Sequence, residues 1–201
     1  MDWMQIFTLV TGVLYIIYEI RQKNFMWVVG IATSLAAMWV FFRQGLYASF
    51  GLNTYYFITA FIGLWHWTRD KKALSESPDN KEDTIVLNRL TIKTVLVSAL
   101  VIAVGSLLLS KGMIYLHDAG VLAENPMSLL DSITAVLSAV ATWWLVKSYR
   151  AQWWLWIVAD TLSVALCAFQ EMWWMAALYL VYVASAVYGL FYWKKHGVYL
   201  N

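Results

Sequence analysis

Charged residues are scarce in this chain of 201 residues. They make up 13% of the sequence, against about a quarter in a soluble domain, while 62% of the residues are hydrophobic. There are only two prolines, which argues against a fold of loops, sheets and linkers. Cys167 is the single cysteine, so neither a disulfide framework nor a cysteine-based metal site is expected. These shortages predict an all-α polytopic membrane protein that forms one domain.

Several function classes lack their sequence signature. A net charge of +2, without a basic cluster among aromatics, argues against a nucleic-acid partner. The chain contains no Walker loop, nucleophile elbow or HExxH motif, and its three histidines lack ligand spacing. We therefore expect no enzyme activity, no cofactor and no metal site. The N-terminal stretch lacks a basic n-region and a cleavage site, which indicates a retained first helix instead of a signal peptide.

Long apolar runs are abundant, and they predict seven transmembrane helices. A helix needs about 20 apolar residues to cross ~30 Å of hydrocarbon. Only two connections are long, 69–88 and 111–127, and the first has the composition of a flexible soluble loop. All of the fourteen basic residues except Arg43 and Lys111 lie on one side if the N-terminus is outside, so the positive-inside rule predicts N-out and C-in. The expected spans are about 3–20, 25–42, 46–67, 92–110, 128–146, 151–170 and 173–193.

The sequence also resembles itself. A shift of 126 residues aligns 24–67 with 150–193 without a gap. We therefore predict a SWEET-like 3+1+3 arrangement: repeat 1 over about 3–67, a connector helix over about 92–110 and repeat 2 over about 128–193. Parallel repeats are a transporter architecture with the substrate site near the midplane. The identities are Trp27/Trp153, Ile31/Ile157, Gln44/Gln170, Tyr56/Tyr182, Ala60/Ala186, Gly63/Gly189, Leu64/Leu190 and Trp67/Trp193.

One carboxylate, Asp160, stands alone within 152–170. A central aspartate costs roughly 2.5–3.5 kcal/mol in a membrane helix, so it should face a cavity or a partner. Trp153, Trp156 and Asp160 follow the spacing i, i+3, i+7 and share one helical face. Because indoles attract cations and the carboxylate supplies the counter-charge, this face suits a flat cationic ligand. The alternative is an interfacial tryptophan belt, with Asp160 bonded to the hydroxyl of Thr161 or Ser163.

Other polar residues in the predicted spans are less specific. Asn53 and Tyr56 make the span 46–67 polar on more than one side, and an amide inside a membrane needs a partner or a cavity. Asp131 is near the outer end of its helix, where it either caps the helix or faces water. Glu19 is interpreted as a charge on the inner surface.

Two stretches carry a family resemblance: GLYASFGLNTYYFITAFIGLWHW (45–67) and WWLWIVADTLSVALCAFQ (153–170). Together with the Asp131–Ser132 pair, they resemble the PnuC family of vitamin transporters over nearly the whole chain. The resemblance implies a 3+1+3 helix fold in the bacterial inner membrane. It also implies facilitated diffusion, with the vitamin trapped inside by a cytoplasmic kinase. A homo-oligomer is left open.

The resemblance bears on the substrate as well. Where members for nicotinamide riboside carry amides, this chain has Thr33, Asn53, Ala60 and Asp160. That pattern resembles the thiamine (PnuT-like) branch, so thiamine is the first expectation and nicotinamide riboside, also a cation, is the alternative. A membrane sensor or accessory subunit that binds without transport is a third possibility. The predicted substrate-binding residues are Trp153, Trp156, Asp160, Asn53, Thr33 and Tyr56.

Overall fold

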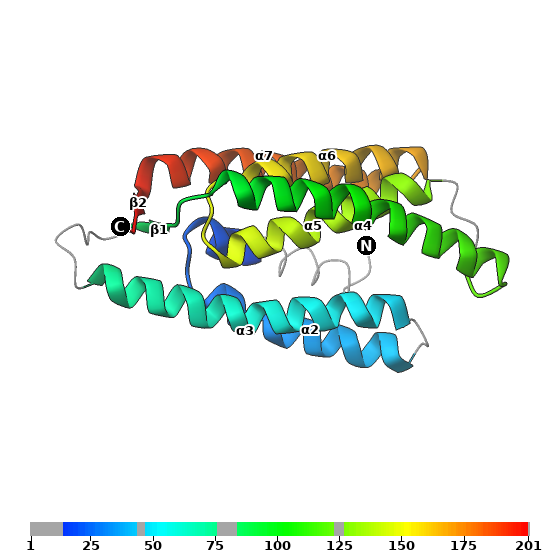
Figure 1. Cartoon of the computed structure of the whole chain (residues 1–201), viewed down its shortest axis with the longest axis horizontal. Coiled ribbons are helices and arrows are strands. Elements are labelled where there is room, and N and C mark those ends of the chain that lie inside the picture. Colours follow the sequence, from blue (N-terminus) through cyan, green and yellow to red (C-terminus); the bar gives the residue numbers. More distant parts are fainter. Residues whose placement is uncertain (1–13, 44–46, 76–83, 123–126, 201) are drawn as a thin grey trace. The chain divides into compact units, whose positions relative to one another are not determined.

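The computed structural model describes residues 14–43, 47–75, 84–122 and 127–200. Residues 14–20 are helical and precede the elements labelled in Figure 1. Those elements are α2 (Phe25–Arg43), α3 (Tyr47–Ser75), β1 (Ile85–Leu87), α4 (Ile92–Asp118), α5 (Ser128–Val146), α6 (Gln152–Phe169), α7 (Trp173–His196) and β2 (Gly197–Tyr199).

The helices follow the predicted spans closely. Within the described ranges, four helices, α4 to α7, are long and apolar enough to cross a membrane by length and composition. Helix α2 coincides with the span predicted at 25–42, and α3 covers the span predicted at 46–67 but extends past its end. The first predicted span, 3–20, lies outside the described residues except for its helical end at 14–20. The all-helical membrane architecture is confirmed in this part of the chain.

The two long connections differ from the prediction. Helix α3 continues to Ser75, so the flexible loop predicted at 69–88 is wrong at its start, where no glycine or proline interrupts the helix. The same connection also contains β1, which pairs in parallel with β2. Helix α4 continues to Asp118, well into the predicted loop 111–127. It stops before Gly120, which adopts a φ of 73°, the left-handed conformation that ends many helices.

Contacts divide the chain into two compact units. Unit 1 comprises Met1–Asn88, Leu145–Arg150 and Tyr192–Asn201, and unit 2 comprises Arg89–Trp144 and Ala151–Phe191. In unit 1, α2 and α3 run side by side (Figure 1). Their close approach depends on Gly63, where a Cβ atom would lie 2.5 Å from the Trp27 ring. Only glycine leaves room for the indole at this crossing.

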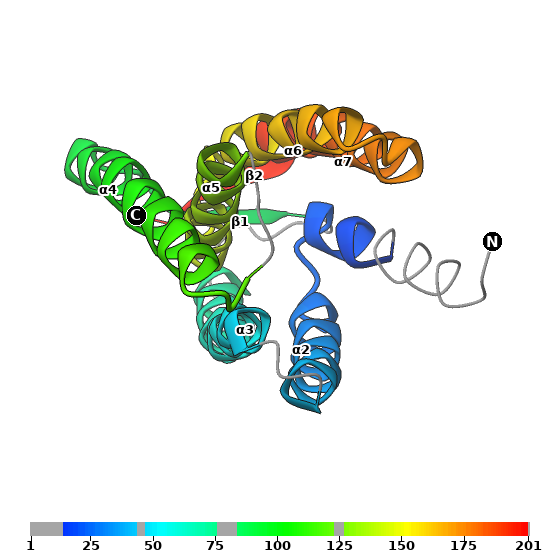
Figure 2. The same cartoon turned by 90° about the vertical axis from the view of Figure 1, so that its right-hand side faces the viewer.

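Unit 2 contains α4, the main part of α5, α6 and the main part of α7, seen end-on in Figure 2. Small polar residues join α4 to α5: Trp144 Nε1 donates to Ser98 Oγ at 3.0 Å, and the Ser110 and Ser128 hydroxyls lie 2.9 Å apart. Such residues let membrane helices approach and hydrogen-bond. Between α6 and α7, the Trp153 ring covers Gly189, where a Cβ would lie 2.6 Å from it.

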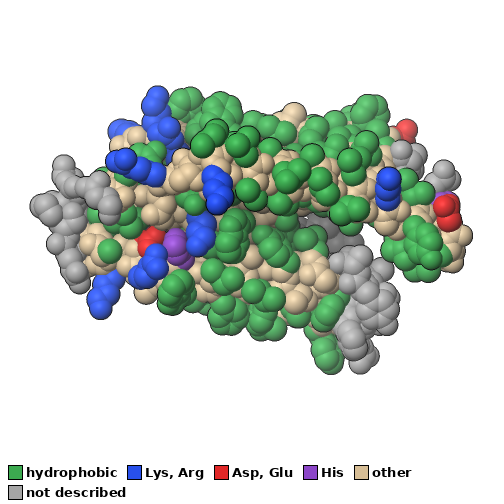
Figure 3. Space-filling view, in the orientation of Figure 1, with side chains coloured by type: hydrophobic (Ala, Val, Ile, Leu, Met, Phe, Trp, Pro, Cys, Tyr) green, Lys and Arg blue, Asp and Glu red, His purple; other side chains and the backbone are tan. Residues whose placement is uncertain are grey.

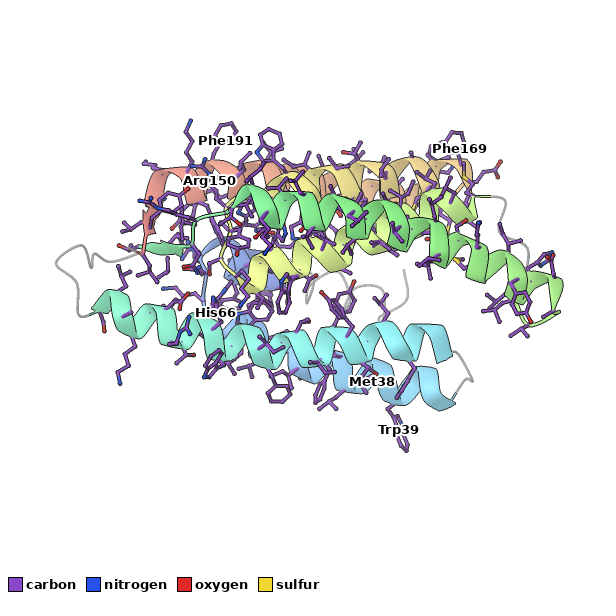
Figure 4. All side chains as sticks on the ribbon, in the orientation of Figure 1. Met38, Trp39, His66, Arg150, Phe169 and Phe191 are labelled. Carbon is purple, nitrogen blue, oxygen red and sulfur yellow. The ribbon has the colours of Figure 1, made fainter. Side chains whose placement is uncertain are left out.

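Many of the side chains that the helices expose are large and hydrophobic. Large hydrophobic side chains cover the outer face of α4, as Figure 3 shows. On other helices, Trp39, Phe169 and Phe191 are exposed and point away from their own helix (Figure 4). A soluble domain rarely exposes so large an apolar area, whereas hydrocarbon solvates it.

Candidate functional site

Asp160 lies in the middle of α6 and is buried, with 8% of its surface exposed. Among the described residues, no hydrogen bond or ion pair engages its carboxylate. The neighbouring hydroxyls bond to their own helix: Thr161 Oγ1 donates to Ile157 O at 2.7 Å, and Ser163 Oγ donates to Ala159 O at 3.0 Å. The alternative in which Asp160 is held by one of these hydroxyls is therefore wrong.

Two tyrosines of α7 lie within electrostatic range of this carboxylate. The Asp160 charge acts electrostatically on both Tyr179 and Tyr182. The two phenol rings pack edge to face with centroids 5.8 Å apart. These residues were missed in the sequence, although the Tyr56/Tyr182 identity at the 126-residue shift could have pointed to Tyr182. They extend the candidate site from one helix to a helix pair.

Trp156 supplies the second unpaired group. Its side chain is half-buried, and its indole Nε1 is buried without an acceptor in the described part of the chain. A buried indole N–H usually finds a partner, and leaving it unpaired costs about 1–3 kcal/mol. An unpaired donor and an unpaired carboxylate thus lie one helical turn apart. In native structures such unsatisfied groups are few, and a functional role or a bound water or ion is among their usual causes.

Trp153 has a different environment from Trp156. It is 2% exposed, and its six-membered ring packs on Gly189. Trp27 packs on Gly63 in the same way, and both pairs are related by the 126-residue shift. The observed contact of Trp153 is therefore helix packing, and its predicted contact with substrate stays a prediction.

The other three predicted residues lie in unit 1. Thr33 is exposed, and its Oγ1 donates to Val29 O at 2.9 Å and Gly30 O at 3.1 Å. Asn53 and Tyr56 are half-buried on α3. Among the described side chains of α2, the buried polar one is instead Ser34, the neighbour of Thr33. Ser34 corresponds to Asp160 under the 126-residue shift, and the sequence interpretation missed it.

The sequence analysis interpreted Glu19 as a charge on the inner surface, and this interpretation is wrong because the side chain is buried. It is 5% exposed and interacts electrostatically with Tyr15 one turn earlier. The turn that follows the first helix is covered because Gln22 packs against β1. In the described ranges no group of three His, Cys, Asp or Glu residues could hold a metal ion.

Comparisons with known proteins give a consistent picture. A family model described as "Nicotinamide mononucleotide transporter" matches residues 2–195. The "Nicotinamide riboside transporter PnuC" of Neisseria mucosa is 28% identical over 203 residues, covering 96% of this chain and 73% of the relative. The protein of the same name from Haemophilus influenzae is 24% identical over 195 residues, covering 96% of this chain and 80% of the relative. A solved structure, "Crystal structure of the Vitamin B3 transporter PnuC", matches 94% of this chain and 79% of its own, with a TM-score of 0.65 and 25% identity.

Proposed function

The chain belongs to the nicotinamide mononucleotide transporter family, and we propose that it carries a cationic vitamin, nicotinamide riboside first, across the bacterial inner membrane. It is a multi-pass membrane protein. The names of its relatives, nicotinamide riboside transporters, support this substrate over thiamine, which the sequence had placed first.

The observation that carries the proposal is the uncompensated carboxylate of Asp160. A buried charge is costly unless an opposite charge or hydrogen bonds accompany it. Nicotinamide riboside carries a flat pyridinium ring, which can stack on the Trp156 indole while its positive charge lies near Asp160. The phenols of Tyr179 and Tyr182 complete an aromatic, electron-rich surround. Thr33, Asn53, Tyr56 and Trp153 remain proposed contributors.

Thiamine is the second candidate. Its thiazolium is also a flat permanent cation, and the acid at position 160, where the resemblance associates an amide with nicotinamide riboside, favours it. The same surround of indole and phenols suits both ligands.

Transport proceeds by alternating access of two parallel repeats, over about 3–67 and 128–193, with the connector helix between them. The shared Trp-on-Gly packing at positions 126 residues apart supports this relationship. No coupling to an energy source is proposed. The vitamin moves down its gradient, with the C-terminus inside the cell, and is trapped by phosphorylation.

Uptake by purified protein in proteoliposomes, without ATP or an ion gradient, tests the proposal. We expect saturable flux of radiolabelled nicotinamide riboside, with weaker flux of thiamine. Binding of either vitamin without any flux would instead identify a sensor or accessory subunit. Stronger flux of thiamine would reverse the order of the two substrates.

A further inference from the structure

Gln22 and Ser148 are 126 positions apart and contact each other directly. Gln22 Nε2 donates to Ser148 Oγ at 3.1 Å, and the two residues are only 1% and 0% exposed. Both adopt left-handed backbone conformations, with φ of 48° and 54°, in the turns after 14–20 and after α5. Equivalent residues of two related halves meet only beside their symmetry axis. This contact therefore lies on the axis of the two proposed repeats.

A pair of reciprocal hydrogen bonds surrounds this contact. Trp67 Nε1 donates to Leu145 O at 3.1 Å, and Trp193 Nε1 donates to Ile20 O at 2.9 Å. Each tryptophan comes from the last helix of one repeat and binds the end of the first helix of the other repeat. Such an exchange of equivalent contacts is the pattern of a two-fold interface.

The segment between the repeats is tied into the same cluster. The side-chain amide of Gln22 bonds to both backbone polar groups of Val86. Gln22 Nε2 donates to Val86 O at 2.9 Å, and Val86 N donates to Gln22 Oε1 at 2.8 Å. Strand β1 also pairs with β2, which follows the last helix of repeat 2. Asn88 N then donates to Ser148 O at 3.2 Å. The segment 85–88 is thus bonded to the turn after the first helix of each repeat.

We propose that this axial latch, made of Gln22, Ser148, Val86, Trp67 and Trp193, is the inner gate of the transporter. The proposal rests on the transport function above, since a gate has meaning only if substrate leaves along the axis. In this structure the latch is closed, because Gln22 and Ser148 are buried and bonded to each other. Its contacts are hydrogen bonds, which water can replace on opening at a small net cost for each bond.

A second observation indicates that the closed arrangement alternates with another one. Gln152, four residues after Ser148, is 0% exposed, and neither polar atom of its amide has a partner in the described part of the chain. An unpaired buried amide destabilises the state that contains it. Opening the region around this turn to water would satisfy the amide, so the closed state carries a cost that opening relieves.

Cysteine accessibility tests the gate. In Ser148→Cys, the new thiol is buried while the latch is closed, so a membrane-impermeant maleimide reacts only when it opens. We expect labelling in inverted vesicles, which present the predicted cytoplasmic end, and none in right-side-out vesicles. The equally buried Ser132→Cys is the matched control, since Ser132 is 0% exposed on α5 and its hydroxyl donates to Met113 Sδ within unit 2. Cys167 is present in every variant, so mass spectrometry assigns each modified site.

In the Ser148→Cys background the hydroxyl that Gln22 contacts is already gone, so adding Gln22→Ala removes the two hydrogen bonds to the Val86 backbone, each worth a factor of roughly two to ten in the equilibrium. The labelling rate should rise about fourfold or more in the Ser148→Cys background, with no rise in the Ser132→Cys background. An unchanged rate, or an equal rise in both backgrounds, would overturn the gate. If Ser148→Cys does not fold, Val86→Cys reads the same opening, because Val86 is 1% exposed and its backbone is bonded to Gln22. Loss of vitamin flux in the parent protein would refute the proposed function alone, since the labelling comparison needs no vitamin.

Discussion

Gly189→Ala tests the packing of the Trp153 ring on Gly189, and the distance between them gives the expected loss of stability. A Cβ atom at this position would lie 2.6 Å from the Trp153 ring, which is closer than real contacts allow. Overpacking of this kind costs typically about 1–3 kcal/mol. Alanine regains roughly 0.8–1 kcal/mol through its higher helix propensity. We therefore expect a net loss of stability of up to about 2 kcal/mol.

Gly63→Ala should show a loss of the same size, because its Cβ would lie 2.5 Å from Trp27. The control is Gly112→Ala in α4, where nothing lies within 4 Å of a new Cβ and a small gain is expected. The measurement is the thermal unfolding midpoint in detergent for all three variants. If Gly189→Ala were as stable as Gly112→Ala, the indole would not occupy the position described, and the packing argument would fail.

Three further predictions concern the ligand face, a lysine and the topology. Trp156→Ala should weaken vitamin binding by about 1–3 kcal/mol through lost stacking and cation–π contacts, whereas exposed Trp154→Ala should leave affinity unchanged in the same titration. Burial lowers the pKa of Lys71, beyond the membrane span, from 10.5 to about 8, with Lys23 adding to the effect. Because the folded chain favours the neutral amine, Lys71 makes the free energy of unfolding rise between about pH 8 and 10.5. Acetylation of Lys71, followed by peptide mass spectrometry, should reach half its maximal rate near pH 8. Tags inserted at 76–83 and after residue 201 should both report cytoplasmic and a tag at 123–126 periplasmic; a periplasmic C-terminus would contradict the predicted N-out orientation.

The sequence predicted the helices because the thickness of the hydrocarbon core fixes how long an apolar run must be. The ends of the helices depend on other forces. Helix α3 runs on to Ser75 because its polar residues are good helix formers, and hydropathy does not record that preference. Strand β1 could not be predicted from three apolar residues. Its conformation depends on the side chain of Gln22, 64 positions away, and on β2 at the other end of the chain.

The sequence predicted the charged residue and the tryptophan of the candidate site but not its other polar residues. Asp160 and Trp156 stand out because a carboxylate is rare in an apolar run. Tyr182, Ser34 and Gln22 do not stand out, since uncharged polar residues are common in such helices and only tertiary contacts show which of them are buried. The predicted family is confirmed by the match over residues 2–195. In the sequence, only one pattern pointed to the packing role of Trp153: its separation from Gly189 equals the separation of Trp27 from Gly63.

The most direct test of the central claim asks whether Asp160 binds the ligand through its charge. Nicotinamide riboside and its reduced dihydro form have nearly the same shape, but only the oxidised form carries the pyridinium charge. The pyridinium nitrogen carries no hydrogen, so Asp160 acts on it through charge, and two unit charges about 4 Å apart attract by about 4 kcal/mol at an effective dielectric constant of ~20. Titrating both ligands into the wild type and Asp160→Asn should show a preference for the cation that falls about tenfold or more in the variant. The same preference in both proteins would show that the carboxylate does not hold the cation, and the proposed site would be wrong.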